Sequence, residues 1–124
     1  MARPLPRNLL IELIERKRLL LCLDYDGTLA PTTANPADAT PFVGATRAIR
    51  TLSGHPDDVV IVIVSGREAN STRRLLGISE ALYFVGMHGI ELLDCDDHRE
   101  LLVEVKHCLP ALHTVRDWLQ KEAR

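Results

Sequence analysis

Two carboxylates two residues apart, Asp24 and Asp26, follow a continuous apolar run and precede Gly27 and Thr28. If the backbone stays extended there, both side chains lie on the same side of the chain and concentrate negative charge. Such a pair favours a hard cation, and Mg²⁺ suits an oxygen-rich, sulfur-free site better than zinc or copper. Gly27 permits a sharp turn toward a ligand, and Thr28 can offer a hydroxyl and an amide to phosphate. The segment therefore predicts a site for a metal ion and a phosphate group.

Two further polar segments follow apolar runs later in the chain. They are Ser65-Gly66-Arg67 after Val59–Val64, and Gly86-Met87-His88-Gly89 after Leu82–Val85. Ligands of an open parallel sheet bind outside the carboxyl ends of its strands. We therefore expect the polar residues of all three segments to share one edge: Asp24, Asp26, Ser65 and His88. A helix that starts after Gly66 would add amide donors and the positive end of its dipole.

The periodicity of the apolar residues predicts alternating strands and helices, which is typical of an α/β domain with a parallel sheet. The runs at 19–23 and 59–64 are continuous, as in strands buried on both faces. The other expected elements are helices over 7–17 and 68–76, the second ended by Gly77, a third strand over 82–85, and a loop over 30–41. A further helix should start at Thr40-Pro41, bury Ala45, Ala48, Ile49 and Leu52, and end at Gly54.

Beyond the third strand the pattern changes to alternation, which predicts a hairpin around the turn Asp94–Asp97. Its first arm holds Ile90 and Leu92, and its second holds Leu101, Val103 and Val105. Pro110 should then open a last helix that carries Leu112, Val115 and Leu119. The hairpin and this helix complete the predicted elements.

Length and composition predict one soluble domain of 124 residues, 46% of them hydrophobic. A formal charge of -2 leaves no basic surface for nucleic acid or an anionic membrane. Glu12 and Glu15 interrupt the N-terminal apolar stretch, which argues against a signal peptide, and no apolar run approaches the roughly 20 residues that span a bilayer. Cys22, Cys95 and Cys108 form no C-x-x-C pair, so we expect neither a disulfide framework nor a zinc site. We expect a cytoplasmic location, because a reducing compartment suits free cysteines.

An apolar strand followed by Asp24-Tyr25-Asp26-Gly27-Thr28-Leu29 resembles the first motif of the haloacid dehalogenase superfamily. The resemblance implies a Rossmann-like core of parallel strands flanked by helices, with Asp24 as nucleophile and Asp26 as general acid and then general base. It also implies that Asp24, the backbone carbonyl of Asp26 and the phosphate hold Mg²⁺. Attack by the carboxylate would form an aspartyl-phosphate that water hydrolyses, which divides one hard displacement into two easier steps. Ser65 matches the second motif, whose hydroxyl holds the transferring phosphoryl group.

Within that superfamily, three segments are similar in order and spacing to trehalose-6-phosphate phosphatases: 23–31, 64–67 and 86–91. This resemblance covers most of the chain and implies Mg²⁺-dependent hydrolysis of trehalose 6-phosphate in trehalose biosynthesis. It places Thr28, Ser65 and Gly66 at the phosphate, and it places four residues near the sugar phosphate: Arg67, His88, Gly89 and Glu91. From the residues alone, Arg67 could equally pair with a surface acid, and His88 could cap the hairpin. Ser65-Gly66-Arg67 taken alone is also typical of an ordinary strand-to-helix turn with a serine cap.

The resemblance also implies parts that are not found in this chain. A third motif with a basic residue, a fourth with an acidic pair and a cap domain around the sugar are all expected after the hairpin. Lys106 and the acids Asp94, Asp96 and Asp97 have suitable charges but lack the motif context, and a solvated turn is favoured for the acids. Residues 1–124 are thus expected to form part of a core domain, truncated before the cap and the last strands. Without a C-terminal half or a second subunit, activity of the chain is in doubt.

Three other functions stay open at this point. The chain could belong to another sugar phosphatase of the same superfamily, because the absent cap would select the sugar. It could be a non-catalytic module that binds a partner through an exposed sheet edge, since such edges favour pairing. A receiver-like phosphoacceptor is a third class, although the Asp-x-Asp-Gly-Thr order and the hairpin disfavour it.

Overall fold

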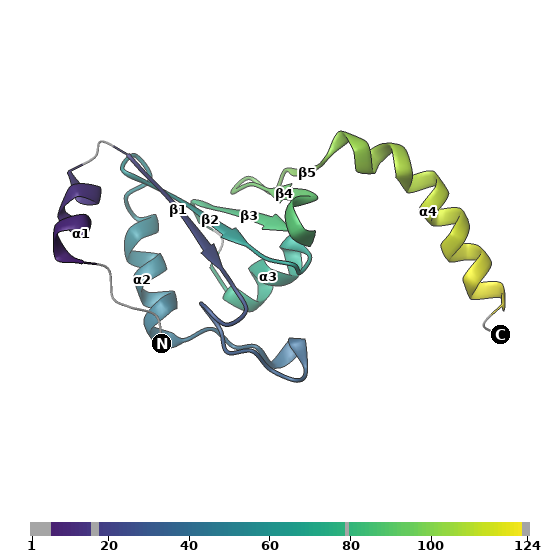
Figure 1. Ribbon diagram of the computed structural model, residues 1–124, viewed down its shortest axis with the longest axis horizontal. Helices are drawn as coiled ribbons and strands as arrows, with labels where there is room; N and C mark the ends of the chain where they lie inside the picture. The colour runs from purple at the N-terminus through teal and green to yellow at the C-terminus, as the bar shows by residue number, and fades with distance from the viewer. Residues whose placement is uncertain (1–5, 16–17, 79, 123–124) are drawn as a thin grey trace.

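The computed structural model describes residues 6–15, 18–78 and 80–122, and it contains one sheet with helices beside it (Figure 1). In chain order the elements are α1 (Arg7–Ile14), β1 (Leu19–Asp24), the 3-10 helix η1 (Pro36–Asp38), α2 (Val43–Ser53), β2 (Val59–Val64), α3 (Ala69–Leu76), β3 (Leu82–Gly86), the 3-10 helix η2 (Met87–Gly89), β4 (Glu91–Leu93), β5 (Arg99–Leu101) and α4 (Val103–Glu122). The three predicted strands and the helix predicted over 68–76 are confirmed to within one residue at each end. The helix predicted over 7–17 ends earlier, at Ile14, and its predicted residues 16–17 lie outside the described residues.

The five strands form one sheet in the order β1-β2-β3-β4-β5. The first three are parallel, with Asp24 opposite Val64 and Val64 opposite Val85. The last two are antiparallel and form the predicted hairpin. The α/β class with parallel strands and a hairpin is therefore confirmed. Because β1, β2 and β3 end level with one another, the loops that follow them leave the sheet at the same edge.

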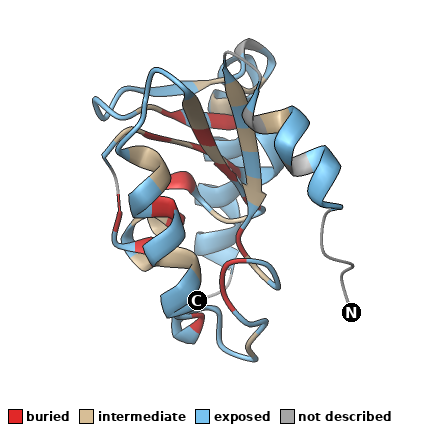
Figure 2. Cartoon of the chain, turned by 90° about the vertical axis from the view of Figure 1, so that its left-hand side faces the viewer, coloured by how far each residue is buried: buried red, intermediate tan, exposed pale blue. Residues whose placement is uncertain are grey.

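The hydrophobic core lies on one face of the sheet. Its buried strand residues are Ile61, Ile63, Leu82, Phe84 and Leu93, and α2 and α3 contribute Ile49, Ala69 and Leu76. In Figure 2 the buried residues lie mainly on the strands, on the helices next to them and on the loop after β1. The core therefore supports the strand ends and the start of α3 from the same side.

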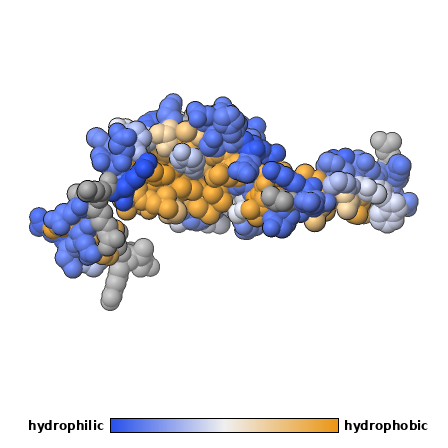
Figure 3. Space-filling model, turned by 90° about the horizontal axis from the view of Figure 1, so that it is seen from above, coloured by the Kyte–Doolittle hydropathy of each residue, from blue (hydrophilic) through white to orange (hydrophobic). Residues whose placement is uncertain are grey.

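The opposite face of the sheet is only partly covered by the described residues. Leu20 is 63% exposed, Val64 is 36% exposed and Leu92 is 38% exposed. Successive side chains of a strand point to opposite faces, which explains the alternating burial along β1. Figure 3 shows hydrophobic residues gathered over the middle of the molecule. The prediction that these strands are buried on both faces is wrong for this chain, because α2 and α3 both pack into the core on one face.

Two predictions about α2 are also wrong. The helix begins at Val43 rather than at Thr40-Pro41, and its N-cap residue, Phe42, makes no side-chain cap hydrogen bond. The amide of Phe42 donates to the carbonyl of Leu29 at 2.8 Å, which holds this segment extended beside the turn after β1. Ala48 is exposed, so the buried stripe of the helix is narrower than its apolar residues suggest.

The second hairpin arm is shorter than predicted, and the last helix is longer. β5 ends at Leu101, whereas Val103 and Val105 belong to α4, and Pro110 lies inside α4 rather than at its start. A few alternating residues do not distinguish a strand from the first turns of a helix. The apolar residues assigned to this helix are largely exposed: Leu112 56%, Val115 54% and Leu119 53%. In Figure 1 α4 extends away from the sheet. Among the described helices, none has the length and apolar character required to cross a membrane.

Candidate active site

The turn after β1 places the first carboxylate of the candidate site. The carbonyl of Tyr25 accepts a hydrogen bond from the amide of Leu29 at 3.0 Å, and Gly27 has φ 86. Glycine adopts this left-handed conformation without the steric cost of a side chain. Asp24 is exposed at the end of β1, and its Oδ2 accepts a hydrogen bond from Thr28 Oγ1 at 3.3 Å. The turn therefore brings Asp24 and Thr28 together.

Tyr25 anchors the backbone between the two carboxylates. Its side chain is 0% exposed, and its hydroxyl donates to the carbonyl of Ala39 at 2.7 Å. Burial raises the pKa of the Tyr25 hydroxyl, so the group remains a donor. Tyr25 was not selected from the sequence, although an aromatic residue at a strand end between Asp24 and Asp26 was the available signal.

Arg67 binds Asp26 through two parallel hydrogen bonds. Nε donates to Oδ2 and Nη2 donates to Oδ1, both at 2.7 Å, while Nη1 donates to the carbonyl of Pro36 at 2.7 Å. These hydrogen bonds from Arg67 lower the pKa of Asp26, and the carboxylate in turn raises the pKa of Arg67. The guanidinium also lies 5.7 Å from the centroid of the Tyr25 ring, within the range of a cation–π contact. Arg67 therefore pairs with an acid, but that acid is the second carboxylate of the site.

A cavity of about 270 Å³ lies beside this ion pair, lined by Asp26, Thr32, Thr33, Pro36 and Arg67. The lining combines a carboxylate, a guanidinium and two hydroxyl groups, and such groups bind phosphates and sugar hydroxyls. From the sequence, residues 30–41 were predicted only as a loop. The two threonines shortly after the Asp24 motif were the signal that could have identified it as part of the site.

Ser65 connects the end of β2 to the same region. It is 4% exposed, its amide donates to the carbonyl of Val85 at 2.9 Å, and its Oγ accepts the amide of Arg67 at 3.1 Å. The N-cap residue of α3 is Glu68, so Ser65 does not cap that helix. Its hydroxyl still has one hydrogen to donate.

His88 lies over Gly66. A Cβ added to Gly66 would stand 2.6 Å from Cε1 and 2.9 Å from Nε2 of His88. The chain reaches this position through three consecutive residues with positive φ: Met87 at 50°, His88 at 57° and Gly89 at 94°. Such conformations are uncommon for residues other than glycine and cluster at functional sites. The amide of His88 donates to the carbonyl of Ser65 at 3.3 Å, which joins the third loop to the second.

Glu91 faces inward rather than toward the cavity. It is 1% exposed, and Oε1 accepts the amide of Ala69, the first residue of α3. Oε2 accepts a hydrogen bond from Arg99 Nε at 2.7 Å. The first amide of α3 therefore already has an acceptor within the protein, contrary to the expectation that it would be offered to a phosphate. Arg99 was not selected from the sequence, because nothing local to β5 indicates its partner.

The contacts above connect the loops after β1, β2 and β3 into one candidate site. Asp26 contacts Arg67, Gly66 contacts His88, and Asp24 contacts Thr28. The oxygen donors fit Mg²⁺, which takes one or two carboxylates together with substrate oxygens. Arg67 occupies both carboxylate oxygens of Asp26, so Asp24 supplies the accessible carboxylate. The Asp24 side chain therefore fits a metal ligand, and the backbone carbonyl of Asp26 as a second ligand stays a prediction.

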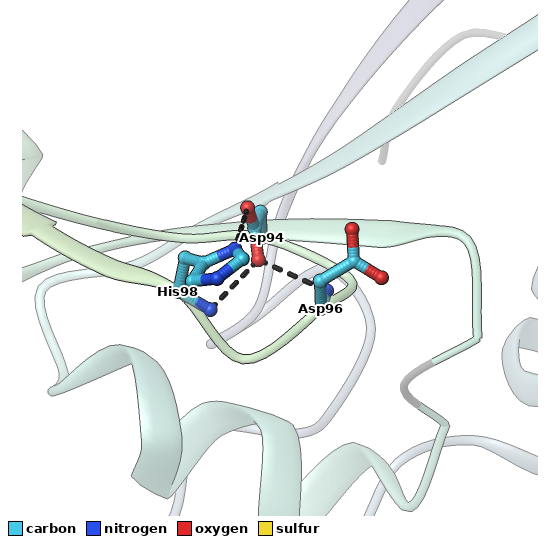
Figure 4. Close-up of side chains that lie close together, drawn as sticks. All are labelled: Asp94, Asp96 and His98. Atoms are coloured by element: carbon cyan, nitrogen blue, oxygen red, sulfur yellow. Dashed lines mark hydrogen bonds and ion pairs between the residues drawn. The ribbon is translucent and has the colours of Figure 1, made fainter.

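The acids of the hairpin turn have a local structural role. Figure 4 shows Asp94 between Asp96 and His98. Asp94 Oδ1 accepts the amides of Asp96 at 2.9 Å and His98 at 2.8 Å, and Oδ2 lies 3.3 Å from His98 Nδ1. Desolvation acts to raise the pKa of Asp94, but these hydrogen bonds with His98 and Asp96 lower it overall. Asp97 pairs with Arg73 of α3. This geometry is that of a side-chain-stabilised turn.

Comparison with known proteins agrees with the family that the sequence resembles and with the fold. Residues 22–124 match the Trehalose-phosphatase family. The chain is 34% identical over 76 residues to the probable trehalose-phosphate phosphatase 4 of Oryza sativa subsp. japonica, which covers 61% of this chain and 20% of the relative. The C-terminal domain of the C. albicans trehalose-6-phosphate phosphatase has a TM-score of 0.70 and 31% identity, over 81% of this chain and 34% of that structure.

A more distant structure has the same fold. A haloacid dehalogenase-like hydrolase from B. subtilis has a TM-score of 0.52 and 18% identity, over 84% of this chain and 34% of that structure. The chain thus spans about a fifth of the length of the first curated relatives and about a third of the solved structures. These comparisons show the fold of a haloacid dehalogenase-like hydrolase.

Proposed function

Since the chain belongs to the trehalose-phosphatase family, we propose that the protein hydrolyses trehalose 6-phosphate to trehalose and phosphate. The observation that carries the proposal is the group of contacts among Asp24–Thr28, Ser65–Arg67 and His88 at the carboxyl ends of three parallel strands. Relatives named trehalose-phosphate phosphatases support the choice of substrate. The substrate and the activity of the whole protein are both part of the proposal.

In the proposed reaction, a carboxylate oxygen of Asp24 attacks the phosphorus atom, and the bond from phosphorus to the sugar oxygen breaks. In its protonated form, Asp26 donates a proton to the leaving sugar oxygen, and the resulting carboxylate then removes a proton from the water that attacks the aspartyl-phosphate. The second step releases phosphate and restores the Asp24 carboxylate. The exposed position of Asp24 at the end of β1 supports its role as nucleophile.

Arg67 can form bidentate hydrogen bonds with either a carboxylate or a phosphate. In the structure it binds Asp26 and lines the cavity. We propose that the phosphate of the substrate competes with Asp26 for this guanidinium. Partial release from Arg67 would allow the Asp26 carboxyl to take part in proton transfer, so one cation would couple substrate binding to acid–base chemistry.

The remaining residues of the proposed site bind the phosphate or the sugar. Ser65 and Thr28 offer hydroxyl hydrogens to the phosphoryl oxygens, and Gly66 allows them close approach. His88 and Gly89, both exposed after β3, would contact the sugar side. Asp24 and the backbone carbonyl of Asp26 would hold Mg²⁺, whose charge reduces the repulsion between the carboxylate and the phosphate dianion.

We further propose that residues 1–124 are part of a core domain that other groups complete. The family resemblance requires a basic residue and a second acidic pair, and a single well-placed charged donor can be worth about 100-fold or more in rate. Lys106 lies in α4 and Asp94 stabilises the hairpin turn. A C-terminal half or a second subunit would supply the missing groups and the cap over the sugar.

The test is phosphate release from trehalose 6-phosphate with Mg²⁺, for this chain and for a version extended to the length of its relatives. Asp24→Asn should abolish release, while Asp57→Asn, an exposed acid outside the candidate site, should leave it unchanged. Equal turnover by Asp24→Asn would refute Asp24 as nucleophile. Faster hydrolysis of a different sugar phosphate would favour another sugar phosphatase of the superfamily. Failure of both versions with every sugar phosphate would favour a non-catalytic binding module.

A further inference from the structure

Glu91 is a buried carboxylate that the proposed chemistry does not use. Its side chain is 0% exposed, although it belongs to the short hairpin strand β4. Oε1 accepts the amide of Ala69, and Oε2 accepts Nε of Arg99 at 2.7 Å, with Nη2 of Arg99 at 2.5 Å. A buried charge is tolerated when it is paired and hydrogen-bonded, and both conditions hold here.

Glu91 supplies an acceptor where α3 has no cap of its own. Glu68 is the N-cap residue, and it makes no side-chain cap hydrogen bond. The first amides of a helix need acceptors, and a negative charge at that end also interacts favourably with the helix dipole. Glu91 provides both from a different element, across 22 residues of sequence. The start of α3 therefore depends on the hairpin.

Gly86 allows this contact to form. It lies opposite Glu91 in the sheet. A Cβ at Gly86 would stand 2.5 Å from the Ala69 amide nitrogen, 2.6 Å from Glu91 Oε1 and 2.8 Å from the Arg67 carbonyl oxygen. Real Cβ atoms do not approach so closely. Three separate parts of the chain, 67–69, Gly86 and Glu91, thus converge at one point, with no room for a side chain at the centre.

The same junction holds the loop Ser65-Gly66-Arg67. Backbone hydrogen bonds connect the Met87 amide to the Arg67 carbonyl at 2.7 Å and the Ser65 amide to the Val85 carbonyl at 2.9 Å. Ala69 follows this loop by only two residues, so the hydrogen bond from Ala69 to Glu91 fixes its far end. Arg67, which binds Asp26, lies between these attachments.

We propose that Glu91 is a positioning residue, which holds the start of α3 and with it the Ser65-Gly66-Arg67 loop in the arrangement that phosphoryl transfer requires, and which makes no contact with the substrate. This inference rests on the proposed function for its catalytic consequence, and on the geometry for its structural one. Arg99 is the cation that keeps the buried carboxylate in place.

The first test compares the wild-type chain with Glu91→Gln by NMR, which measures amide hydrogen exchange and amide chemical shifts. Glutamine keeps an acceptor oxygen but loses the charge, and charge-assisted hydrogen bonds are roughly twice as strong as neutral ones. We expect exchange at Ala69 to quicken by about tenfold, with shifted amide signals at Ser65 and Arg67. Glu100→Gln, an exposed acid on the neighbouring strand, should change neither. Arg99→Gln retains Glu91 and should quicken exchange of the Ala69 amide by a smaller factor. This variant provides the test if Glu91→Gln fails to fold.

The second test separates positioning from substrate contact by kinetics with trehalose 6-phosphate. A positioning role predicts that Glu91→Gln lowers kcat by up to about 100-fold, since small misplacements of catalytic groups have effects of this size, with KM changed less than about twofold. A rise in KM alone, with unshifted loop amides, would instead make Glu91 a substrate ligand and overturn the inference. Unchanged Ala69 exchange in both Glu91→Gln and Arg99→Gln would also overturn it. If neither the wild-type chain nor its extended version releases phosphate, the proposed function fails, while the exchange experiment still decides the role of Glu91.

Discussion

The ion pair between Arg67 and Asp26 should stabilise the folded chain measurably, although it lies at an accessible site. We would replace Arg67 with Met, which keeps the apolar stem, and Asp26 with Asn, which keeps the shape. The two single variants and the double variant form a thermodynamic cycle. Its coupling free energy isolates the interaction between the two side chains from their other contacts.

The expected size follows from burial and geometry. Exposed ion pairs typically contribute about 0.2–1 kcal/mol, while hydrogen bonds to charged groups contribute about 1.5–3 kcal/mol each. The Arg67 side chain is 16% exposed and that of Asp26 is 35% exposed, with two hydrogen bonds of 2.7 Å. Solvent around Asp26 screens the pair, so we expect a coupling of about 1–2 kcal/mol rather than the sum of two charged hydrogen bonds.

The assay is urea unfolding at neutral pH, with Arg116 and Asp117 as the matched control pair. Their nitrogen and oxygen atoms are also 2.7 Å apart, but the side chains are 59% and 56% exposed on α4. The control coupling should be below about 0.5 kcal/mol. A coupling between Arg67 and Asp26 that is no larger than the control value would refute the reasoning from burial.

The coupling should also depend on pH in a defined direction. Arg67 lowers the pKa of Asp26 from its ordinary value of 3.8. A carboxyl group with a lowered pKa in the folded state contributes its full stabilisation above the unfolded value. The contribution is then lost as the pH falls from 3.8 through the lower folded pKa. A coupling that increased on acidification would contradict the assignment of the charged pair.

Three further predictions concern the supports of the site and can be measured by the same urea unfolding. Gly86→Ala should lower the free energy of unfolding by about 1–3 kcal/mol, because its Cβ would overlap three atoms at 2.5–2.8 Å. An unchanged value would show that the junction is loose. Gly77→Ala should lower the free energy of unfolding by about 1–2 kcal/mol, because φ at Gly77 is 65°, even though no atom lies within 4 Å of the added Cβ. Gly44 has equally open surroundings but lies inside α2. Gly44→Ala should therefore raise the free energy of unfolding by about 0.5–1 kcal/mol. Equal effects at the two glycines would contradict the conformational argument. Tyr25→Phe should lower it by about 1–2 kcal/mol, since the buried carbonyl of Ala39 loses its donor, and no loss would indicate that water replaces the hydroxyl.

Much of the scaffold could be predicted from local sequence. The apolar runs at 19–23 and 59–64 became β1 and β2 because continuous β-branched and leucine residues bounded by polar turns favour strands. Gly77 ended α3 because only glycine adopts the required left-handed conformation cheaply. The end of α2 followed from Gly54. The start of α2 did not follow from local sequence, because a tertiary hydrogen bond from the Phe42 amide to the Leu29 carbonyl overrode the N-cap pattern at Thr40-Pro41.

Predictions failed where the pattern was short or where burial depended on distant packing. Three alternating residues could not distinguish a β5 extension from the first turn of α4. Burial of both sheet faces was inferred from hydrophobicity, but hydrophobicity does not reveal which face the helices cover. Both α2 and α3 packed on the same face, so Leu20 and Val64 remained exposed.

The chemical groups of the candidate site, and the strand ends that carry them, could be identified from residue types and local patterns. Asp24, Asp26 and Ser65 follow apolar runs directly, and the parallel sheet brings such positions to one edge. The partners of the charged groups, in contrast, depend on the packing of distant segments. Arg67 reaches Asp26 across 41 residues and Glu91 reaches Ala69 across 22. Such pairings depend on how strands and helices pack in space, because residue type and local spacing specify that a charge needs a partner but not which partner it finds.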